Sequence, residues 1–247
     1  MKSRLKNTLF KIVKLVSSLF NLKSHEAYDF NKSNPLGGDG ERVDIQINSD
    51  FKFEKLDIYQ KSHFKRYEFA KDLILTGEVC GDFACGTGYG SILLSEKASK
   101  VVGADINDMV IQEIKERYNS TRNVIFLNEN LLNLKYKDYF DTIISYETIE
   151  HFTENDILKL LDIFRLGLKN NGKLIFSTPY MQERSVSAEK LGFHLTFHIN
   201  EEKIKSFLLQ CGFEPILFTY QNYLTHNIEC DIVKRDFIIC VAKKINK

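Results

Sequence analysis

The sequence predicts an α/β domain built on a doubly wound, mostly parallel sheet and preceded by a separate N-terminal helix. Three observations predict this fold. Apolar strand-like runs alternate with helical patterns from about residue 64 onward, which is the order of strand–helix–strand units. A glycine cluster, Gly86-x-Gly88-x-Gly90, follows the first of these runs. The chain has 247 residues, 43% of them hydrophobic, enough to bury a core without disulfides or a structural metal.

The charged residues are unevenly distributed. Residues 1–25 carry six basic residues and no acidic one, which leaves 28 basic against 33 acidic residues in the remainder. A nucleic-acid-binding domain usually presents a basic face, so we expect no nucleic-acid partner. The five cysteines form no C-x-x-C pair and are odd in number. They predict neither a zinc knuckle nor a disulfide framework, and they fit a reducing, cytoplasmic compartment.

Residues 1–24 have the pattern of an amphipathic basic helix. Apolar side chains fall on one half of the helical wheel, and Lys6, Lys11 and Lys14 fall on the other. Lys11 and Lys14 interrupt any run long enough to span a membrane, and no small-x-small cleavage site follows. Two alternatives remain open: a helix lying on an anionic membrane surface, and a helix packed on its own domain or a partner subunit. Residues 25–60, rich in glycine around Pro35, are predicted to be a linker or substrate-side extension.

Helices are predicted where apolar side chains recur every three or four residues. The first three such stretches cover residues 64–75, 92–98 and 109–118. Thr153-Glu-Asn-Asp156 resembles a capping box that starts a fourth helix, and Asn170-Asn171-Gly172 is expected to end it. Asn200 can cap a last helix that Gly212 terminates.

Seven strands are predicted from short apolar runs bounded by turn residues. They cover residues 78–84, 100–105, 124–127, 141–146, 173–177, 214–220 and 236–242. In doubly wound sheets, ligands bind where the strands end at their carboxyl edge. The loops after the strands are therefore where a site is expected.

The glycine loop after the first strand indicates a small-molecule cofactor. Glycines between a strand and a helix let the backbone approach a ligand closely. The spacing differs from the dinucleotide fingerprint, and no Gly-Lys-Ser/Thr follows for a phosphate-binding loop. Asp82, four residues before Gly86, suits a cationic ligand better than a pyrophosphate. Asp105, at the end of the next strand, can accept both hydroxyls of a ribose.

These segments resemble the motifs of class I S-adenosylmethionine-dependent methyltransferases. The matching segments are Asp82–Gly90 as the first motif, 101–106 as the second strand, 128–131 as the adenine-side motif, 140–147 as the fourth strand and 168–177 as the fifth. The resemblance implies a methyltransferase domain over residues 61–247, with seven mostly parallel strands, the last one antiparallel, and S-adenosylmethionine as cofactor. Ala84 departs from the glycine, and Asn130 from the aspartate, that many members carry.

The resemblance also assigns roles around the cofactor. Gly86 and Gly88 would line its methionine part, and Asp105 would bind its ribose. Ile106 and Leu131 would enclose the adenine, whose exocyclic amine Asn130 would contact. The candidate cofactor-binding residues are Tyr67, Asp82, Ala84, Gly86, Gly88, Asp105, Ile106, Asn130, Leu131 and Tyr146.

A helical motif before the first strand, His63-x-x-Arg66-Tyr67-x-Phe-Ala70, narrows the resemblance. It recurs in methyltransferases encoded among bacterial cell-surface glycan genes. In that reading Tyr67 could close over the sulfonium and Arg66 could reach a carboxylate. The alternative is a pair of helix residues that merely pack on the sheet.

The segment after the fourth strand predicts an oxygen acceptor. Ser145-Tyr-Glu147-Thr-Ile-Glu150-His151 stands where amine methylators often carry Asn/Asp-Pro-Pro-Tyr. Glu147, Glu150 and His151 would share one face of a helical turn and could hold Mg²⁺ or another divalent cation. The spacing resembles the metal site of ubiquinone-pathway and small-RNA 2′-hydroxyl methyltransferases. His151 as a metal-free general base and a purely structural turn are the alternatives.

The catalytic candidates are therefore His151 and Glu147, with His194 and His198 as further candidate bases. The predicted function is O-methylation of a sugar or sugar-linked hydroxyl in surface-glycan biosynthesis, in the cytoplasm or at the inner face of the cytoplasmic membrane. Two alternatives are kept: a quinone-type small-molecule O-methyltransferase, and a non-catalytic cofactor-binding scaffold at the membrane. The partner is a small-molecule or glycan acceptor whose identity the sequence leaves open, as it does the oligomeric state.

Overall fold

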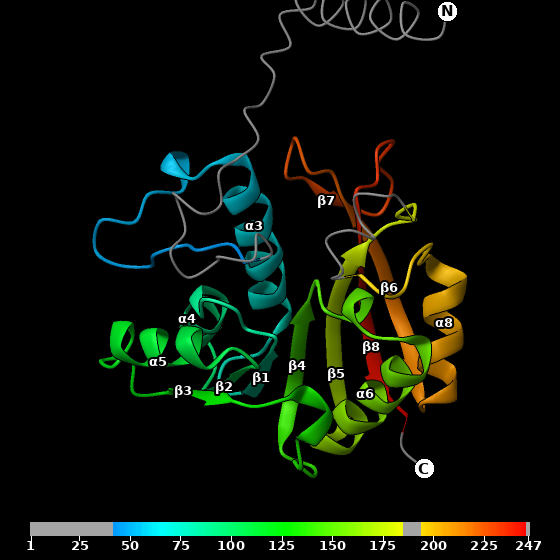
Figure 1. Ribbon diagram of the computed structural model, residues 1–247, viewed down its shortest axis with the longest axis horizontal. Helices are drawn as coiled ribbons and strands as arrows, with labels where there is room; N and C mark the ends of the chain where they lie inside the picture. The colour runs from blue at the N-terminus through cyan, green and yellow to red at the C-terminus, as the bar shows by residue number, and fades with distance from the viewer. Residues whose placement is uncertain (1–41, 185–193, 246–247) are drawn as a thin grey trace, which may run out of the picture. The chain divides into compact units, whose positions relative to one another are not determined.

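The computed structural model describes residues 42–184 and 194–245 (Figure 1). The chain divides into two compact units, Met1–Arg42 and Val43–Lys247, and all elements described below belong to the second. The predicted helix over residues 1–24 lies outside the described residues. Across the part that is described, we find no helix of the length and hydropathy that a membrane span needs.

The second unit is built on an eight-stranded sheet in the order β3-β2-β1-β4-β5-β8-β6-β7 (Figure 1). The strands are β1 Val79–Phe83, β2 Lys100–Asp105, β3 Val124–Asn128, β4 Phe140–Tyr146, β5 Leu168–Pro179, β6 Phe213–Gln221, β7 Ile228–Glu229 and β8 Phe237–Lys244. Strands β1 to β5 pair in parallel, whereas β8 runs antiparallel to both β5 and β6. The predicted Rossmann-like sheet is confirmed, and the short β7 adds an eighth strand to the seven expected.

Helices cover both faces of this sheet. They are η1 Phe53–Lys55, α3 Ile58–Leu73, α4 Tyr89–Ser95, α5 Asp108–Arg117, η2 Leu131–Asn133, η3 Ile149–His151, α6 Glu154–Gly167 and α8 Glu201–Gln210. One buried cluster joins α3 and α4 to the sheet, and the other joins α6 and α8 to its opposite face. The carboxyl edge between these layers carries the loops in which a site was expected.

Side-chain caps fix where several helices begin. In α3, Asp57 accepts from the Gln60 amide nitrogen at 2.9 Å, and Gln60 accepts from the Asp57 nitrogen at 3.0 Å. This capping box starts the helix at Ile58, before the predicted residue 64, so α3 runs through the expected domain boundary at residue 61. The predicted caps Thr153 and Asn200 are confirmed, since each accepts from the amide three residues onward.

The predicted end of the fourth helix is wrong. Helix α6 already ends at Gly167, and Leu168 begins β5 by pairing with Phe140. The Asn170-Asn171-Gly172 sequence instead lies inside β5, where Asn171 has φ +62° and the pairing with β4 shifts register. A residue with positive φ accommodates such a bulge, so the turn signal marks an irregular strand rather than a helix end.

Residues 43–47, here called the strap, lie against the glycine loop and α5. The Val43 carbonyl accepts from the Thr87 hydroxyl at 2.9 Å, and Arg117 pairs with Asp44 at 2.6 Å. Ile45 is buried. Part of the stretch at residues 25–60 that was expected to be a linker or substrate-side extension therefore packs into the body of the second unit.

Candidate active site

The loop from β1 to α4 has a backbone that only small residues adopt easily. Ala84, Gly86 and Gly88 all have φ between +51° and +76°. A Cβ on Gly88 would lie 2.9 Å from the ring of Phe126. Ala84 stands in a left-handed conformation that costs a non-glycine residue about 1–2 kcal/mol. The loop shape is thus set by the sequence before any ligand binds.

Asp82 is fully buried at the end of β1. Its two oxygens accept from the Tyr67 hydroxyl at 2.9 Å and from the Ser91 hydroxyl at 2.6 Å. Burial raises the pKa of this carboxyl to about 6, against the hydrogen bonds from Ser91 and Tyr67, which lower it. Asp82 therefore joins α3, β1 and α4, and it can act on a bound cation through its charge.

The ring of Tyr67 packs closely against the start of α4, directly after the glycine loop. A Cβ on Gly90 would lie 2.1 Å from the Tyr67 ring, and the rings of Tyr89 and Tyr146 contact it edge-on at 5.2 and 5.1 Å. The Tyr146 hydroxyl in turn donates to the Arg66 carbonyl at 2.9 Å. Tyr67 and Tyr146 are thus packed into the core next to the loop rather than standing free above it.

The end of β2 offers the features that a nucleoside needs. Asp105 accepts from the amides of Gly86 at 3.1 Å and Asn107 at 3.0 Å, which aims its carboxylate at the loop. The next residue, Ile106, is 66% exposed. On the following loop Leu131 is buried, and Asn130 accepts from the Leu132 amide at 2.9 Å. An acid for ribose hydroxyls beside an exposed apolar side chain for a base fits the adenosine part of S-adenosylmethionine.

Glu147 does not lie on a helical turn with Glu150 and His151, so that prediction is wrong. Glu147 has φ +49°, Thr148 is not helical, and the 3-10 helix η3 covers Ile149–His151 only. Glu147 instead faces β5, where it accepts from the Ser177 hydroxyl at 2.6 Å. Its positive φ is uncommon for a non-glycine residue.

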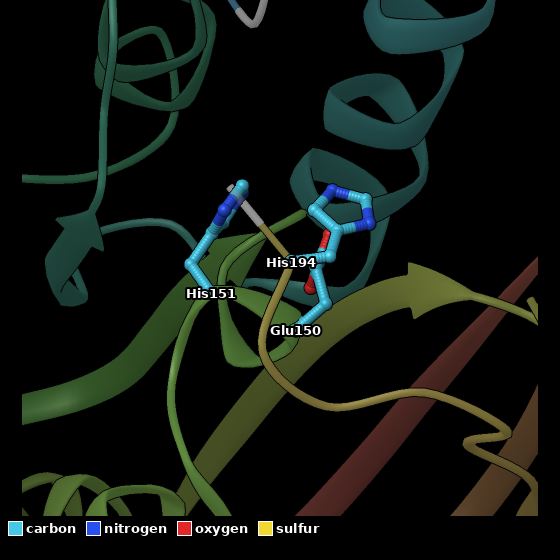
Figure 2. A group of neighbouring side chains, drawn as sticks. All are labelled: Glu150, His151 and His194. Atoms are coloured by element: carbon cyan, nitrogen blue, oxygen red, sulfur yellow. The ribbon is translucent and has the colours of Figure 1, made fainter. Parts of the chain in front are cut away.

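Glu150, His151 and His194 are brought together in place of the predicted set (Figure 2). Their nitrogen and carboxylate oxygen atoms lie within 4.8 Å of one another, and the two imidazole rings meet edge-on at 4.9 Å. The Glu150 carbonyl accepts from the amides of Leu195 at 2.7 Å and Thr196 at 3.1 Å. These backbone hydrogen bonds hold His194 next to His151 at the end of β4. No spacing in the sequence indicates that these two residues meet.

The environment of His194 fixes its protonation. Burial, and then the neighbouring His151, lower the pKa of His194 to about 4, so the ring is neutral at physiological pH. Its Nδ1 lies 2.6 Å from the Gln182 side-chain oxygen. Because that oxygen only accepts, Nδ1 carries the proton and Nε2 is left as an acceptor. The other candidate, His198, is about half exposed, 4.0 Å from Glu183, and outside the group.

The three grouped side chains could hold a divalent cation. One carboxylate and two imidazoles suit zinc, iron or a similar transition metal better than magnesium, which prefers oxygen ligands. Burial, and then the charge of Glu147, raise the pKa of Glu150 well above its usual range. The same three groups can equally serve as a metal-free acid–base set.

Comparisons with known proteins agree with this reading of the fold. A family model described as a methyltransferase domain matches residues 81–172. YqeM of Bacillus subtilis, named as a methyltransferase, is 30% identical over 99 residues, covering 38% of this chain and 40% of that protein. Rv3030 of Mycobacterium tuberculosis, named as an S-adenosylmethionine-dependent methyltransferase, is 27% identical over 53% of this chain and 47% of its own. The chain spans about half or less of the length of these relatives.

A further relative covers more of both chains. The ubiquinone/menaquinone biosynthesis C-methyltransferase UbiE of Yersinia enterocolitica is 27% identical over 195 residues, 64% of this chain and 74% of that protein.

Solved structures share the fold at low identity. The N-methyltransferase NodS of Bradyrhizobium japonicum, bound to S-adenosylhomocysteine, has a TM-score of 0.60 at 13% identity over 81% of this chain and 95% of that one. A methyltransferase in complex with the Trm112 activator of Haloferax volcanii has a TM-score of 0.63 at 16% identity, over 74% and 91%. The [4+2]-cyclase SpnF has a TM-score of 0.60 at 13% identity, over 76% and 82%.

The sheet order and the glycine loop define the Rossmann-like fold of class I methyltransferases. Within that class, the match at residues 81–172 and the curated relatives support an S-adenosylmethionine-dependent methyltransferase domain.

Proposed function

We propose that the chain transfers a methyl group from S-adenosylmethionine to a hydroxyl oxygen of a sugar or sugar-linked acceptor. The observation that carries this proposal is the His151–His194 pair beside Glu150 at the end of β4. This position is next to the glycine loop, across the β1–β4 pairing. An acid–base pair there suits a hydroxyl, which must lose a proton when it is methylated.

The protein's part in this reaction is mainly positioning. S-adenosylmethionine supplies an electrophilic methyl carbon. Asp105 and Ile106 hold its nucleoside, and the buried charge of Asp82 favours its sulfonium. His151 accepts the proton of the acceptor hydroxyl, and His194, held by Gln182, orients the pair through its neutral ring. Holding two reactants in line removes much of the entropic barrier.

The same three side chains give the reaction a second possible route. A divalent cation held by Glu150, His151 and His194 would lower the pKa of a bound hydroxyl and orient it. The two routes differ in one measurable way, since only the metal route is sensitive to a chelator.

A quinone-type acceptor is the alternative substrate. UbiE is named for ubiquinone and menaquinone biosynthesis, and its match to this chain covers 74% of its length. Under this alternative, the predicted amphipathic helix over residues 1–24 would bring the domain to a lipid-soluble acceptor. A non-catalytic scaffold is the other alternative, because SpnF shows that this fold serves other chemistry.

The test is methyl transfer by the full-length chain from methyl-labelled S-adenosylmethionine to extracted glycan and lipid fractions. Label in the glycan fraction that requires His151 supports the proposal. Label in the lipid fraction alone supports the quinone-type reading. If the chain binds S-adenosylhomocysteine but transfers no methyl group to either fraction, the non-catalytic scaffold is the remaining alternative.

We also propose that residues 1–24 bind the inner face of the cytoplasmic membrane. Six basic groups near an anionic surface contribute about 1 kcal/mol each, and the apolar half adds burial at about 25 cal/mol per Å². Binding to anionic vesicles should therefore weaken with salt without vanishing, and deletion of residues 1–24 should abolish it. If the full-length chain ignores such vesicles and the deletion changes its oligomeric state, the segment packs on its own domain or on a partner subunit instead.

A further inference from the structure

The strap contacts three parts of the domain. Arg117, at the end of α5, donates to both carboxylate oxygens of Asp44, at 2.6 and 3.3 Å. Gln60, in the first turn of α3, donates through its amide to the Asp44 carbonyl at 2.7 Å. The Thr87 hydroxyl, in the glycine loop, donates to the Val43 carbonyl at 2.9 Å. The strap therefore joins α3, α5 and the glycine loop.

The Asp44–Arg117 pair is the charged contact of the strap. The two side chains are 11% and 17% exposed, and ion pairs shielded from solvent are screened less than surface pairs. Two parallel contacts between a guanidinium and a carboxylate also fix the geometry of both groups. Arg117 has a second partner in Glu113 at 2.9 Å, but Glu113 belongs to α5 itself. The contact with Asp44 thus ties the strap to α5.

Thr87 lies inside the loop that would bind the cofactor. It stands between Gly86 and Gly88, whose φ values are +51° and +76°, and its side chain is fully buried. A buried hydroxyl needs a hydrogen-bond partner, which the Val43 carbonyl supplies. A Cβ on Gly88 would lie 2.9 Å from the ring of Phe126, so the loop packs closely on β3 as well. The loop is therefore held both by β3 and by the strap.

The strap is further fixed by its own packing. Ile45 is buried, and its carbonyl accepts from the Tyr118 hydroxyl at 3.4 Å. The Tyr118 ring centroid in turn lies 6.1 Å from that of Phe126, the ring on which Gly88 packs. The strap, the end of α5 and the glycine loop are thus connected. Displacing the strap from α5 would also displace the carbonyl that holds Thr87.

A loop that is already held in its binding conformation binds a ligand more tightly. If the loop adopted that conformation only part of the time, the apparent affinity would fall by that fraction. The Gly86 amide also donates to Asp105 at 3.1 Å, and Asp105 is the acid expected to bind the ribose. The position of the loop therefore affects two parts of the expected cofactor site.

We propose that the Asp44–Arg117 pair positions the glycine loop for the cofactor, acting through the strap and the Val43–Thr87 hydrogen bond. Asp44, Arg117 and Thr87 are positioning residues, because they act on the cofactor through the backbone of the loop. The positioning role rests on the proposed binding of S-adenosylmethionine at this loop and is independent of the identity of the acceptor. It gives the strap a function in cofactor binding.

The test is a double-mutant cycle on the affinity of the full-length chain for S-adenosylhomocysteine, measured by calorimetry. Thr87→Val removes the hydroxyl and keeps the shape of the side chain, and Asp44→Ala removes the pair with Arg117. Each substitution should weaken binding by about threefold to tenfold, and Thr87→Ser should restore it. Because both substitutions break the same connection, the double variant should bind about as tightly as Thr87→Val alone.

Two matched controls separate positioning from a loss of stability. Glu113→Ala removes the other acidic partner of Arg117, and Thr142→Val removes a buried hydroxyl that donates to Glu78 at 2.7 Å. Both should leave the affinity for S-adenosylhomocysteine unchanged. Thr87→Val and Asp44→Ala should also raise the KM for S-adenosylmethionine and leave kcat at saturation unchanged, because saturating cofactor selects the binding conformation.

Three outcomes would overturn the positioning role. The first is unchanged affinity in folded Thr87→Val. The second is a double variant in which the losses of Thr87→Val and Asp44→Ala add in full, which indicates two independent effects. The third is an equal loss in Thr142→Val, which indicates general destabilisation instead of a specific contact.

The positioning role and the proposed function can fail separately. Coupled losses of S-adenosylhomocysteine affinity, without methyl transfer to glycan, support the positioning role and reject the proposed acceptor. Methyl transfer to glycan with a KM for S-adenosylmethionine that neither substitution alters supports the proposed function and overturns the positioning role. A full-length chain that binds no S-adenosylhomocysteine rejects both.

Discussion

The two ends of the carboxyl edge of the sheet differ in whether their buried polar groups have hydrogen-bond partners. At the cofactor end, over β1 and β2, Asp82 and Asp105 accept two hydrogen bonds each from neighbouring groups of the chain. At the acceptor end, beyond β4, Arg66 keeps buried nitrogen atoms without partners, and Glu147, which Arg66 contacts at 3.8 Å, has φ +49°.

The difference indicates that cofactor binding and methyl transfer depend on different ends of the carboxyl edge. The cofactor end is complete by itself and is shaped for a ligand through its backbone. The acceptor end retains a residue with positive φ and buried polar atoms without partners, both of which cost stability. Changes at the acceptor end should therefore alter turnover, and changes at the cofactor end should alter cofactor affinity.

The largest expected effect separates the two ends most clearly. His151→Ala should lower turnover by about 10²- to 10⁴-fold, since a positioned general base contributes that much, while S-adenosylhomocysteine affinity stays the same. Calorimetry and labelled methyl transfer measure the two quantities. His198→Ala, at a half-exposed histidine outside the group, is the matched control and should have little effect. Equal losses in both variants would contradict the assignment.

Chelation decides between the two routes through the same side chains. If Glu150, His151 and His194 hold a metal, activity should disappear in EDTA and return with an added divalent cation. Activity that is indifferent to EDTA assigns His151 as a metal-free base.

Asp105→Ala should act on the cofactor end alone. Losing even one hydrogen bond to a charged group costs about 1.5–3 kcal/mol, so S-adenosylhomocysteine affinity should fall by at least roughly tenfold to a hundredfold, as calorimetry would record. Asp162→Ala removes an exposed acid on α6 and should leave affinity unchanged. Retained affinity in Asp105→Ala would remove Asp105 from the cofactor site.

The buried charge of Asp82 predicts a pH effect at the cofactor end. Its pKa is raised to about 6, so the carboxyl is mostly protonated at pH 5 and mostly charged at pH 7. S-adenosylmethionine carries a positively charged sulfonium, whereas the sulfur of S-adenosylhomocysteine is uncharged. The ratio of the affinity for S-adenosylmethionine to the affinity for S-adenosylhomocysteine should therefore rise by about threefold to tenfold from pH 5 to pH 7. Asp82→Asn should flatten the ratio. A flat ratio in the unmodified chain would show that Asp82 does not act on the sulfonium.

The smallest expected effect is on stability. Ala84→Gly relieves a left-handed alanine, worth about 1–2 kcal/mol, and loses about 0.5–1 kcal/mol to the freedom of glycine in the unfolded chain. Urea unfolding should thus show a gain of about 0.5 kcal/mol. Ala98→Gly, at a buried alanine without positive φ, should destabilise instead.

The cofactor end was predictable because its constraints are local. A strand, a sharp turn with positive φ and a helix follow one another within Asp82–Gly90, and only small residues satisfy that path. Asp105 ends the adjacent strand, so its place beside the loop follows from parallel pairing. The sheet itself followed from the alternation of strands and helices.

The acceptor end was predictable only in part, because its residues meet through tertiary structure. Gln221 reaches Arg66 because β6 pairs with β8, and His194 reaches His151 through backbone bonds to Glu150. No local pattern encodes either contact. The helical turn predicted for Glu147 is wrong because Glu147 has φ +49° and Thr148 is not helical.

The strap, residues 43–47, limits where this domain can be truncated. The stretch that the methyltransferase family model matches, residues 81–172, contains the whole glycine loop. Yet the loop is held from outside that stretch, by Val43 through Thr87 and by Tyr67 through Asp82 and Gly90. A fragment excised at the bounds of that stretch would lose both supports. The stretch that the family model matches is therefore shorter than the stretch that holds the glycine loop in place.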